Sequence, residues 1–184
     1  FIDTDYFYDL VDLSSALDPD NAYILMFGRG WVLNSGMAGK LIQVLEHAYA
    51  RDPEWRTIFD AGWIALYSLR DYEKARSFLK TAMKDPAAPS FVGGIYTYSF
   101  YADRKYEAAI AQISEQIKST DDHTLQTHLE KQLHWYADLL KLNRAAMAYR
   151  ERLGRDIGSL GELVDAGFMD AIPEDRLGKG FVWD

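Results

Sequence analysis

Apolar residues recur every three or four positions along most of the chain, which is the spacing of an amphipathic helix. Two segments that show it clearly contain Leu41, Leu45 and Ala48, and Ala75, Phe78 and Ala82. The strict alternation of apolar and polar residues that marks a half-buried strand is absent from the sequence. The pattern therefore predicts an all-α protein.

The helical pattern itself repeats at a fixed interval along the chain. Asp18-Pro19 recurs as Asp52-Pro53, and a third pair, Asp85-Pro86, follows after almost the same interval. The block Asp71–Ala75 (DYEKA) is echoed one interval later by Lys105–Ala109 (KYEAA). The period is about 34 residues, which is typical of solenoids in which each repeat is one supersecondary unit. We therefore expect an α-α superhelix.

Short breaks divide each period into two helices. They fall at Ser35-Gly36, Arg70-Asp71 and Asp103-Arg104. Each Asp-Pro pair is expected to start a helix, because Asp accepts from free N–H groups and proline is tolerated in the first turn. Each period is thus predicted to be a helical hairpin, with an Asp-Pro pair before the next one.

These features resemble the tetratricopeptide repeat (TPR) family, whose unit is two helices in about 34 residues. Residues 24–31 (I-x-x-F-G-x-x-W) resemble the first-helix pattern, and Tyr72–Ala75 and Tyr106–Ala109 (Tyr-x-x-Ala) resemble the start of the second helix. The resemblance covers about residues 6–118 and implies three hairpins whose first helices line a concave groove. Each turn between paired helices is one residue longer than in the family.

The resemblance implies a protein or peptide partner in that groove. Its lining would be mostly aromatic, which favours an apolar strand or an amphipathic helix as the ligand over a terminal carboxylate. Helical spacing alone does not separate groove residues from residues packed between helices, so both interpretations stay open. On the glycine alignment the groove residues are Leu25, Arg29, Arg56, Phe59, Asp60, Trp63, Tyr67, Tyr98 and Tyr101.

The first helix is expected at residues 6–17, as the second half of a repeat that starts before Phe1. Its apolar face, which includes Phe7, Leu10 and Val11, would then be exposed unless an upstream helix covers it. A chain that begins with Phe1 favours removal of an upstream segment.

After the repeats, residues 122–154 are predicted to form one long helix or two joined helices. The simplest role is a cap on the last hairpin, although the same spacing suits a coiled-coil seam to a partner. The expected domains are a solenoid with capping helices at 1–155 and a short Gly-rich tail at 156–184, packed on or beside it. The apolar stripe of the long helix is Leu125, Leu129, Leu133, Tyr136, Leu140 and Met147.

In the tail, Ser159 and Glu162 have the spacing of a capping box, ahead of a short helix that should stop at Gly167. This segment resembles the C-terminal segment of type II secretion pseudopilins and other bacterial envelope proteins, although Arg176 replaces a usual proline. The resemblance implies a bacterial origin. We treat the acidic residues of the tail as turn formers.

Composition narrows the function further. The chain has 20 Lys and Arg against 28 Asp and Glu, a net charge of −8, and no basic stripe, which disfavours nucleic acid as a partner. No run of about 18 apolar residues is present, so no membrane span is expected in this segment. The absence of cysteine excludes disulfides and thiolate sites.

No arrangement of residues suggests catalysis. His47, His123, His128 and His134 lack the i, i+4 spacing of a zinc-binding helix, and Gly28-x-Gly30 is too short for a dinucleotide loop. We therefore expect no enzyme activity, no cofactor and no metal.

The sequence thus favours a non-enzymatic protein–protein interaction scaffold. The alternative is a membrane-tethered assembly subunit of a bacterial envelope machine, whose groove is filled by its own segments or by another copy. The envelope is favoured over the cytoplasm. The acidic N-terminal segment and the basic residues near 141–155 would allow head-to-tail association of copies, but basic residues also complement a helix C-terminus.

Overall fold

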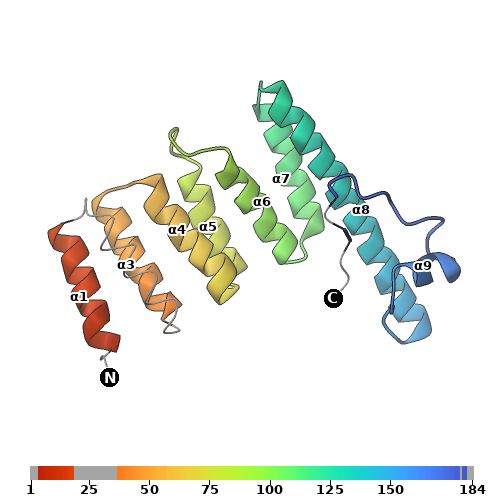
Figure 1. Cartoon of the computed structure of the whole chain (residues 1–184), viewed down its shortest axis with the longest axis horizontal. Helices are drawn as coiled ribbons and strands as arrows, with labels where there is room; N and C mark the ends of the chain where they lie inside the picture. The colour runs from red at the N-terminus through yellow and green to blue at the C-terminus, as the bar shows by residue number, and fades with distance from the viewer. Residues whose placement is uncertain (1–3, 19–36, 179, 182–184) are drawn as a thin grey trace. The chain divides into compact units, whose positions relative to one another are not determined.

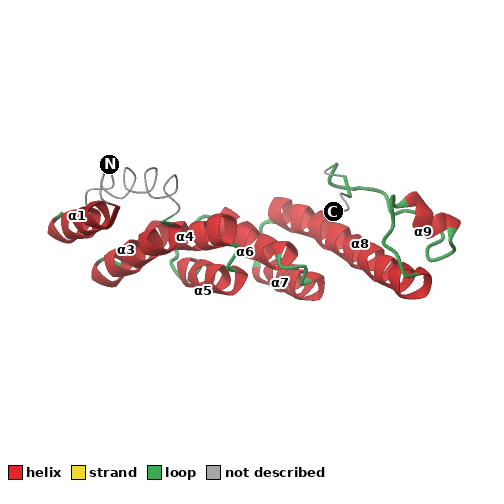
Figure 2. Ribbon diagram, turned by 90° about the horizontal axis from the view of Figure 1, so that it is seen from below, coloured by secondary structure: helices red, strands yellow, loops and turns green. Residues whose placement is uncertain are grey.

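The computed structural model describes residues 4–18, 37–178 and 180–181 of the chain. In these residues all regular structure is helical and no strand occurs (Figure 2). The prediction of an all-α protein is confirmed.

The described elements are α-helices and one π-helical turn, η1 (Figure 1). The predicted helix at 6–17 and the long helix at 122–154 are both present, the latter as one continuous helix. In chain order the elements are α1 (Thr4–Leu17), α3 (Ala38–Arg51), α4 (Trp55–Ile64), η1 (Ala65–Leu69), α5 (Tyr72–Ala82), α6 (Phe91–Ala102), α7 (Tyr106–Ser119), α8 (His123–Leu153) and α9 (Gly161–Asp165).

The helix starts repeat the period of the sequence. Helices α1, α3, α5 and α7 begin at Thr4, Ala38, Tyr72 and Tyr106, which are evenly spaced by one period. The turns before α5 and α7 also share a backbone conformation, because Arg70 and Arg104 have positive φ angles of 54° and 55°. The breaks predicted at Arg70-Asp71 and Asp103-Arg104 are confirmed, whereas Ser35-Gly36 lies outside the described residues.

Asp52-Pro53 and Asp85-Pro86 separate helix pairs but do not cap helices, which corrects the prediction for these two pairs, whereas the segment after Asp18 lies outside the described residues. Asp52 ends α3, and α4 begins after Glu54 without a side-chain cap. Asp85 accepts from the backbone N–H of Ala87 at 2.8 Å, in a turn well before α6 begins at Phe91. An Asp carboxylate bonds backbone N–H groups in turns as well as in caps, so the motif alone does not decide between them.

The chain divides into two compact units, Phe1–Asp103 and Arg104–Asp184. This boundary lies inside residues 1–155, which the sequence pattern predicts to be one domain. In the first unit, helices that follow one another in the described chain pack together: α1 on α3, α3 on α4, α4 on α5 and α5 on α6 (Figure 1). Their shared core contains the fully buried side chains of Leu41, Leu45, Ile64 and Leu79.

Gly62 allows α4 to approach α5 closely. A Cβ atom on Gly62 would lie 2.9 Å from Cγ of Leu79 and 3.3 Å from Cβ of Phe78, which is tighter than side chains normally pack. The same packing role is predicted for Gly28, one period earlier, which lies outside the described residues.

The π-helical turn η1 extends α4 by one further turn. Arg70, in the left-handed conformation, ends it, and the amide of Asp71 donates to the carbonyl of Ala65 at 2.9 Å. A π-helical turn holds more residues than an α-helical turn. It therefore accommodates the additional residue by which the turn between these paired helices exceeds that of the TPR pattern.

A half-buried ion pair joins α5 to the end of α6. Arg76 donates to the carboxylate of Asp103 at 2.9 Å and to the carbonyl of Ser99 at 3.3 Å. Its guanidinium also lies 4.8 Å from the centre of the Phe100 ring. The cation thus lies at the negative dipole end of α6, where it bonds the carbonyl of Ser99.

In the second unit, α8 packs along α7. Leu129 and Tyr136 are buried as predicted, but Met147 is exposed. The period of the helix explains the difference, because it is not a whole number of residues and a stripe followed over many turns drifts around the axis. Further along α8, Leu142, Ala146 and Tyr149 form a core with Ile157 and Leu163 of the tail.

The tail is fastened to α8 through Glu162, but not by a capping box. Leu160 occupies the N-cap of α9 without a side-chain bond, and Glu162 accepts from the N–H of Gly158 at 2.9 Å. The same carboxylate accepts from the hydroxyl of Tyr149 and from Arg155, both at 2.8 Å. Hydrogen bonds from Tyr149, then Arg155 and Gly158, hold the pKa of Glu162 below its usual value.

The predicted stop at Gly167 is confirmed. Gly167 has a φ of 74°, and the N–H of Phe168 donates to the carbonyl of Leu163 at 2.8 Å. This is a Schellman motif, in which a left-handed glycine satisfies carbonyls at the helix end.

Gly62→Ala and Gly94→Ala should change stability in opposite directions. A Cβ at Gly94 meets nothing within 4 Å, so alanine gains about 0.5–1 kcal/mol of helix preference there. At Gly62 the clash with Leu79 costs about 1–3 kcal/mol and outweighs that gain. Thermal melts monitored by circular dichroism would show a raised Tm for Gly94→Ala and a lowered Tm for Gly62→Ala. Equal shifts would contradict the close approach of α4 and α5.

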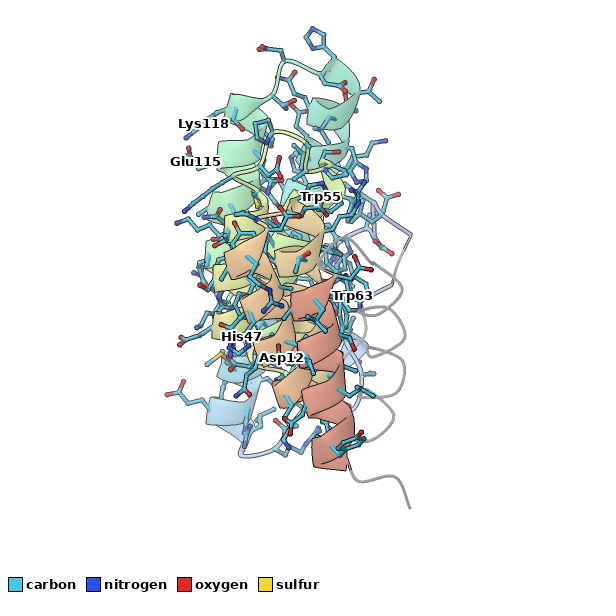
Figure 3. The ribbon with its side chains drawn as sticks, turned by 90° about the vertical axis from the view of Figure 1, so that its left-hand side faces the viewer. Asp12, His47, Trp55, Trp63, Glu115 and Lys118 are labelled. Carbon is cyan, nitrogen blue, oxygen red and sulfur yellow. The ribbon has the colours of Figure 1, made fainter. Side chains whose placement is uncertain are left out.

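Glu162→Gln should lower the stability of the second unit at neutral pH and weaken its dependence on acid. Because the folded-state pKa of Glu162 is depressed, its contribution is present above the usual pKa of glutamate and is lost as the pH falls through the folded-state value. Melting temperatures at a series of pH values would test this. Glu115→Gln is the control, because Glu115 and Lys118 form a largely exposed pair on α7 (Figure 3) that contributes little.

Candidate functional site

Four aromatic residues follow one another along α4 and η1 at intervals of four, namely Trp55, Phe59, Trp63 and Tyr67. This spacing places them on one helix face. The ring centroids of the first two steps are 6.1 Å and 6.0 Å apart, but those of Trp63 and Tyr67 are 4.3 Å apart. The short distance between Trp63 and Tyr67 coincides with η1. A π-helical turn holds more residues than an α-helical turn, so residues four apart lie closer to the same direction from the helix axis.

Helix α6 adds three aromatic residues to this row. Tyr98 stacks on Tyr67 with ring centroids 5.9 Å apart and planes inclined by 19°. Tyr101 lies 5.5 Å from Tyr98, and Phe91 lies edge-on to Phe59 at 5.5 Å. We call the seven residues the aromatic patch: Trp55, Phe59, Trp63, Tyr67, Phe91, Tyr98 and Tyr101.

The aromatic patch is anchored in the core on one side and open on the other. Phe59 and Tyr98 are partly exposed and pack against the core of the first unit. Trp63, Tyr67 and Phe91 are 39%, 44% and 51% exposed. Contiguous exposed apolar surface of this kind marks interaction sites in proteins.

Gly94 leaves open space beside these rings. It follows Phe91 by three positions and precedes Tyr98 by four, so it shares their face of α6. It is exposed, and no atom lies within 4 Å of the position that its Cβ would occupy. The side chain of a ligand can therefore lie against the backbone of α6 between two aromatic rings.

The aromatic patch offers neutral rings and hydroxyl groups. Burial, and secondly the neighbouring Tyr98, raise the pKa of Tyr67, so its phenol stays protonated at neutral pH and can donate a hydrogen bond. At the edge, the guanidinium of Arg56 lies 5.0 Å from the centre of the Trp55 ring, in a cation–π contact. The chemistry suits recognition of apolar surface.

The structure brings five of the predicted groove residues into one cluster, namely Phe59, Trp63, Tyr67, Tyr98 and Tyr101. Trp63 and Tyr67 lie at the surface, whereas Phe59 and Tyr98 contribute to both surface and core. Arg56 stands at the edge, Asp60 is a partly exposed residue of α4, and Leu25 and Arg29 lie outside the described residues.

Sequence reasoning missed two members of the aromatic patch, Trp55 and Phe91. The signal was present in the spacing, because Trp55 lies one turn before Phe59 and Phe91 lies two turns before Tyr98. Figure 3 labels Trp55 and Trp63, which belong to the same helix, α4.

The second unit contains an open hollow of about 790 Å³ between α8 and the tail. Its lining includes Phe168 and Met169 together with charges of both signs. Lys141 is paired with Asp138 at 2.8 Å, and Arg144 with Glu107 at 3.1 Å. These pairs weaken the attraction of the hollow for a charged ligand.

Several other polar residues that the sequence singled out hydrogen-bond to residues near them in the chain. His123 and His128 contact glutamine side chains on α8, and Asp175 accepts from the N–H of Leu177 at 3.0 Å, as expected of a turn former. Within the described ranges, no group of three or more His, Cys, Asp or Glu residues could hold a metal ion. Among the helices listed above, none is long and apolar enough to cross a membrane.

Comparisons of the chain with protein-family models, with curated proteins and with solved structures found no match. The resemblance to the TPR family therefore rests on residues and spacing in the sequence. What the aromatic patch can bind follows from its own geometry.

Proposed function

We propose that the protein is a non-enzymatic interaction scaffold that binds an apolar segment of a partner protein at the aromatic patch. The observation that supports this most directly is the exposure of Trp63, Tyr67 and Phe91 within a cluster of seven aromatic rings. Tryptophan and tyrosine are the residues most often found at the energetic centre of protein interfaces.

The packing of the aromatic patch favours tight binding. Each ring is held by its neighbours, and Phe59 and Tyr98 are held by the core as well. Side chains that are already ordered lose little conformational entropy when a partner covers them. The apolar area that is buried then contributes more of its free energy to affinity.

The expected ligand is an extended strand or an amphipathic helix with large apolar side chains. The rings lie on α4, η1 and α6, whose aromatic side chains contact one another, which suits a segment that lies along them, and the space at Gly94 can receive one of its side chains. Tyrosine hydroxyls provide hydrogen bonds for orientation. The TPR resemblance supports the same location, because α4 and α6 are the first helices of their pairs.

Trp63→Ala and Tyr98→Ala should each weaken binding by roughly 30-fold, because a central aromatic residue commonly contributes about 2 kcal/mol or more. The ligands would be peptides selected from a random display library against the whole chain, with affinities measured by calorimetry. Met147→Ala is the control, because Met147 is an exposed apolar residue of α8 in the second unit. Failure to select any peptide, or equal affinity for all three variants, would contradict the proposal.

The stability of Trp63→Ala should separate a binding role from a core role. Trp63 is 39% exposed, so its loss should lower the Tm far less than Ile64→Ala. Ile64 is 1% exposed, and its truncation should cost about 2–5 kcal/mol of folding free energy. If Trp63→Ala melts as early as Ile64→Ala, the side chain is a core residue and the loss of binding is indirect.

Gly94→Leu should block the same peptides without unfolding the protein. The added side chain meets no atom near its Cβ and leucine favours a helix, so the Tm should not fall. The side chain would occupy the space between Phe91 and Tyr98, which should reduce affinity by roughly tenfold or more. Unchanged affinity would place the ligand elsewhere.

A further inference from the structure

Helix α1 has a second apolar face that points to solvent. Val11 is buried at 6% exposure on the side where α1 packs on α3. Leu10, Leu13 and Leu17 are 46%, 56% and 78% exposed, and their i, i+3 and i, i+4 spacing places them in one stripe. We call these three residues the leucine stripe.

The leucine stripe lies on a strongly acidic helix. Residues 1–28 contain no Lys or Arg, and the residues 4–18 carry four aspartates. Asp12 faces α3, where its carboxylate lies 3.4 Å from Nδ1 of His47 (Figure 3). Asp9 is exposed beside Leu10. The stripe is thus an apolar surface with acidic surroundings.

This charge argues against two occupants of the leucine stripe. A second copy bound through the same face would bring two acidic helices together, and like charges across an interface oppose association. An anionic membrane surface would repel α1 for the same reason.

The basic end of α8 in another copy is also a poor match. Most of its cations already have acidic partners within the second unit: Arg144 pairs with Glu107, and Arg150 with Asp156. Lys141 and Arg155 are likewise paired, with Asp138 and Glu162. Because these acids offset the positive charge, α8 offers little net attraction to an acidic helix.

We propose that the leucine stripe is the docking site for a cationic amphipathic helix of a partner protein. The apolar residues of that helix cover Leu10, Leu13 and Leu17, and a flanking Lys or Arg side chain faces Asp9. Helix-on-helix packing of this kind uses residues spaced by three and four, which is the spacing of the stripe. The site is separate from the aromatic patch, so the two proposals can fail independently.

The test uses the whole chain and two labelled helical peptides of three heptads each. Both carry leucine at the a and d positions, but one has lysine and arginine beside them and the other has glutamate. The basic peptide should bind in a fluorescence polarisation titration, with an affinity that falls as salt is added, and the acidic peptide should not. Equal binding of both peptides, or binding of neither, would overturn the proposal.

Two variants locate the binding on α1. Leu13→Gln should lower the affinity for the basic peptide by roughly tenfold or more. Leu153→Gln, at a similarly exposed leucine of α8, should leave that affinity unchanged. Asp9→Lys should lower the affinity for the basic peptide, make that affinity less dependent on salt, and raise the affinity for the acidic peptide. This reversal depends on charge, so it stays informative even if Leu13→Gln lowers the Tm.

Other outcomes assign the peptide to another surface. Loss of binding in Trp63→Ala but not in Leu13→Gln would overturn the proposal and place the basic peptide at the aromatic patch. Self-association of the chain that Leu13→Gln abolishes, measured by sedimentation, would overturn it in favour of a second copy.

Discussion

The close approach of α4 to α5 at Gly62 is the contact on which the aromatic patch depends. Gly62 faces Leu79 and Phe78, and the next residue, Trp63, is turned by about 100° around the helix. Because one side of α4 packs against α5, the orientation of the helix is fixed and its other side faces solvent. The same helix therefore supplies core residues such as Ile58 and surface residues such as Trp63.

The helical architecture follows from the sequence because it depends on local periodicity. Apolar positions at helical spacing predict the helices, and the longer repeat period predicts where α5 and α7 begin. The hydrogen bonds in the connections between helices were harder to predict, because the same residue type can bond backbone groups in a turn or at a helix cap. Asp85 accepts from a backbone N–H in a turn and not at a helix start. Glu162 accepts from the amide of Gly158, whereas in a capping box it would accept from the amide of Ser159.

The π-helical turn could not be predicted from local pattern. A longer turn between paired helices was visible, but nothing in the residues 65–69 distinguishes a longer loop from an additional helical residue. The consequence for the site is direct, since Trp63 and Tyr67 lie closer than the other pairs along α4.

The candidate site was partly predictable for a similar reason. Phe59, Trp63 and Tyr67 share a face of one helix, which spacing predicts, but their contact with Tyr98 depends on how α6 lies beside α4. Trp55 and Phe91 were missed because the glycine alignment considered only positions that line the groove of the TPR family. Interactions between distant residues, such as Arg76 with Asp103, have no signature in periodicity.

The left-handed residues Arg70 and Arg104 have a consequence for how stability is distributed along the chain. An arginine in this conformation is strained by roughly 1–2 kcal/mol, which glycine would not be. The two positions lie one period apart and belong to different units. Each unit therefore has one exposed position at which replacing arginine by glycine would relieve backbone strain. Such a substitution can stabilise one unit without altering the core of the other.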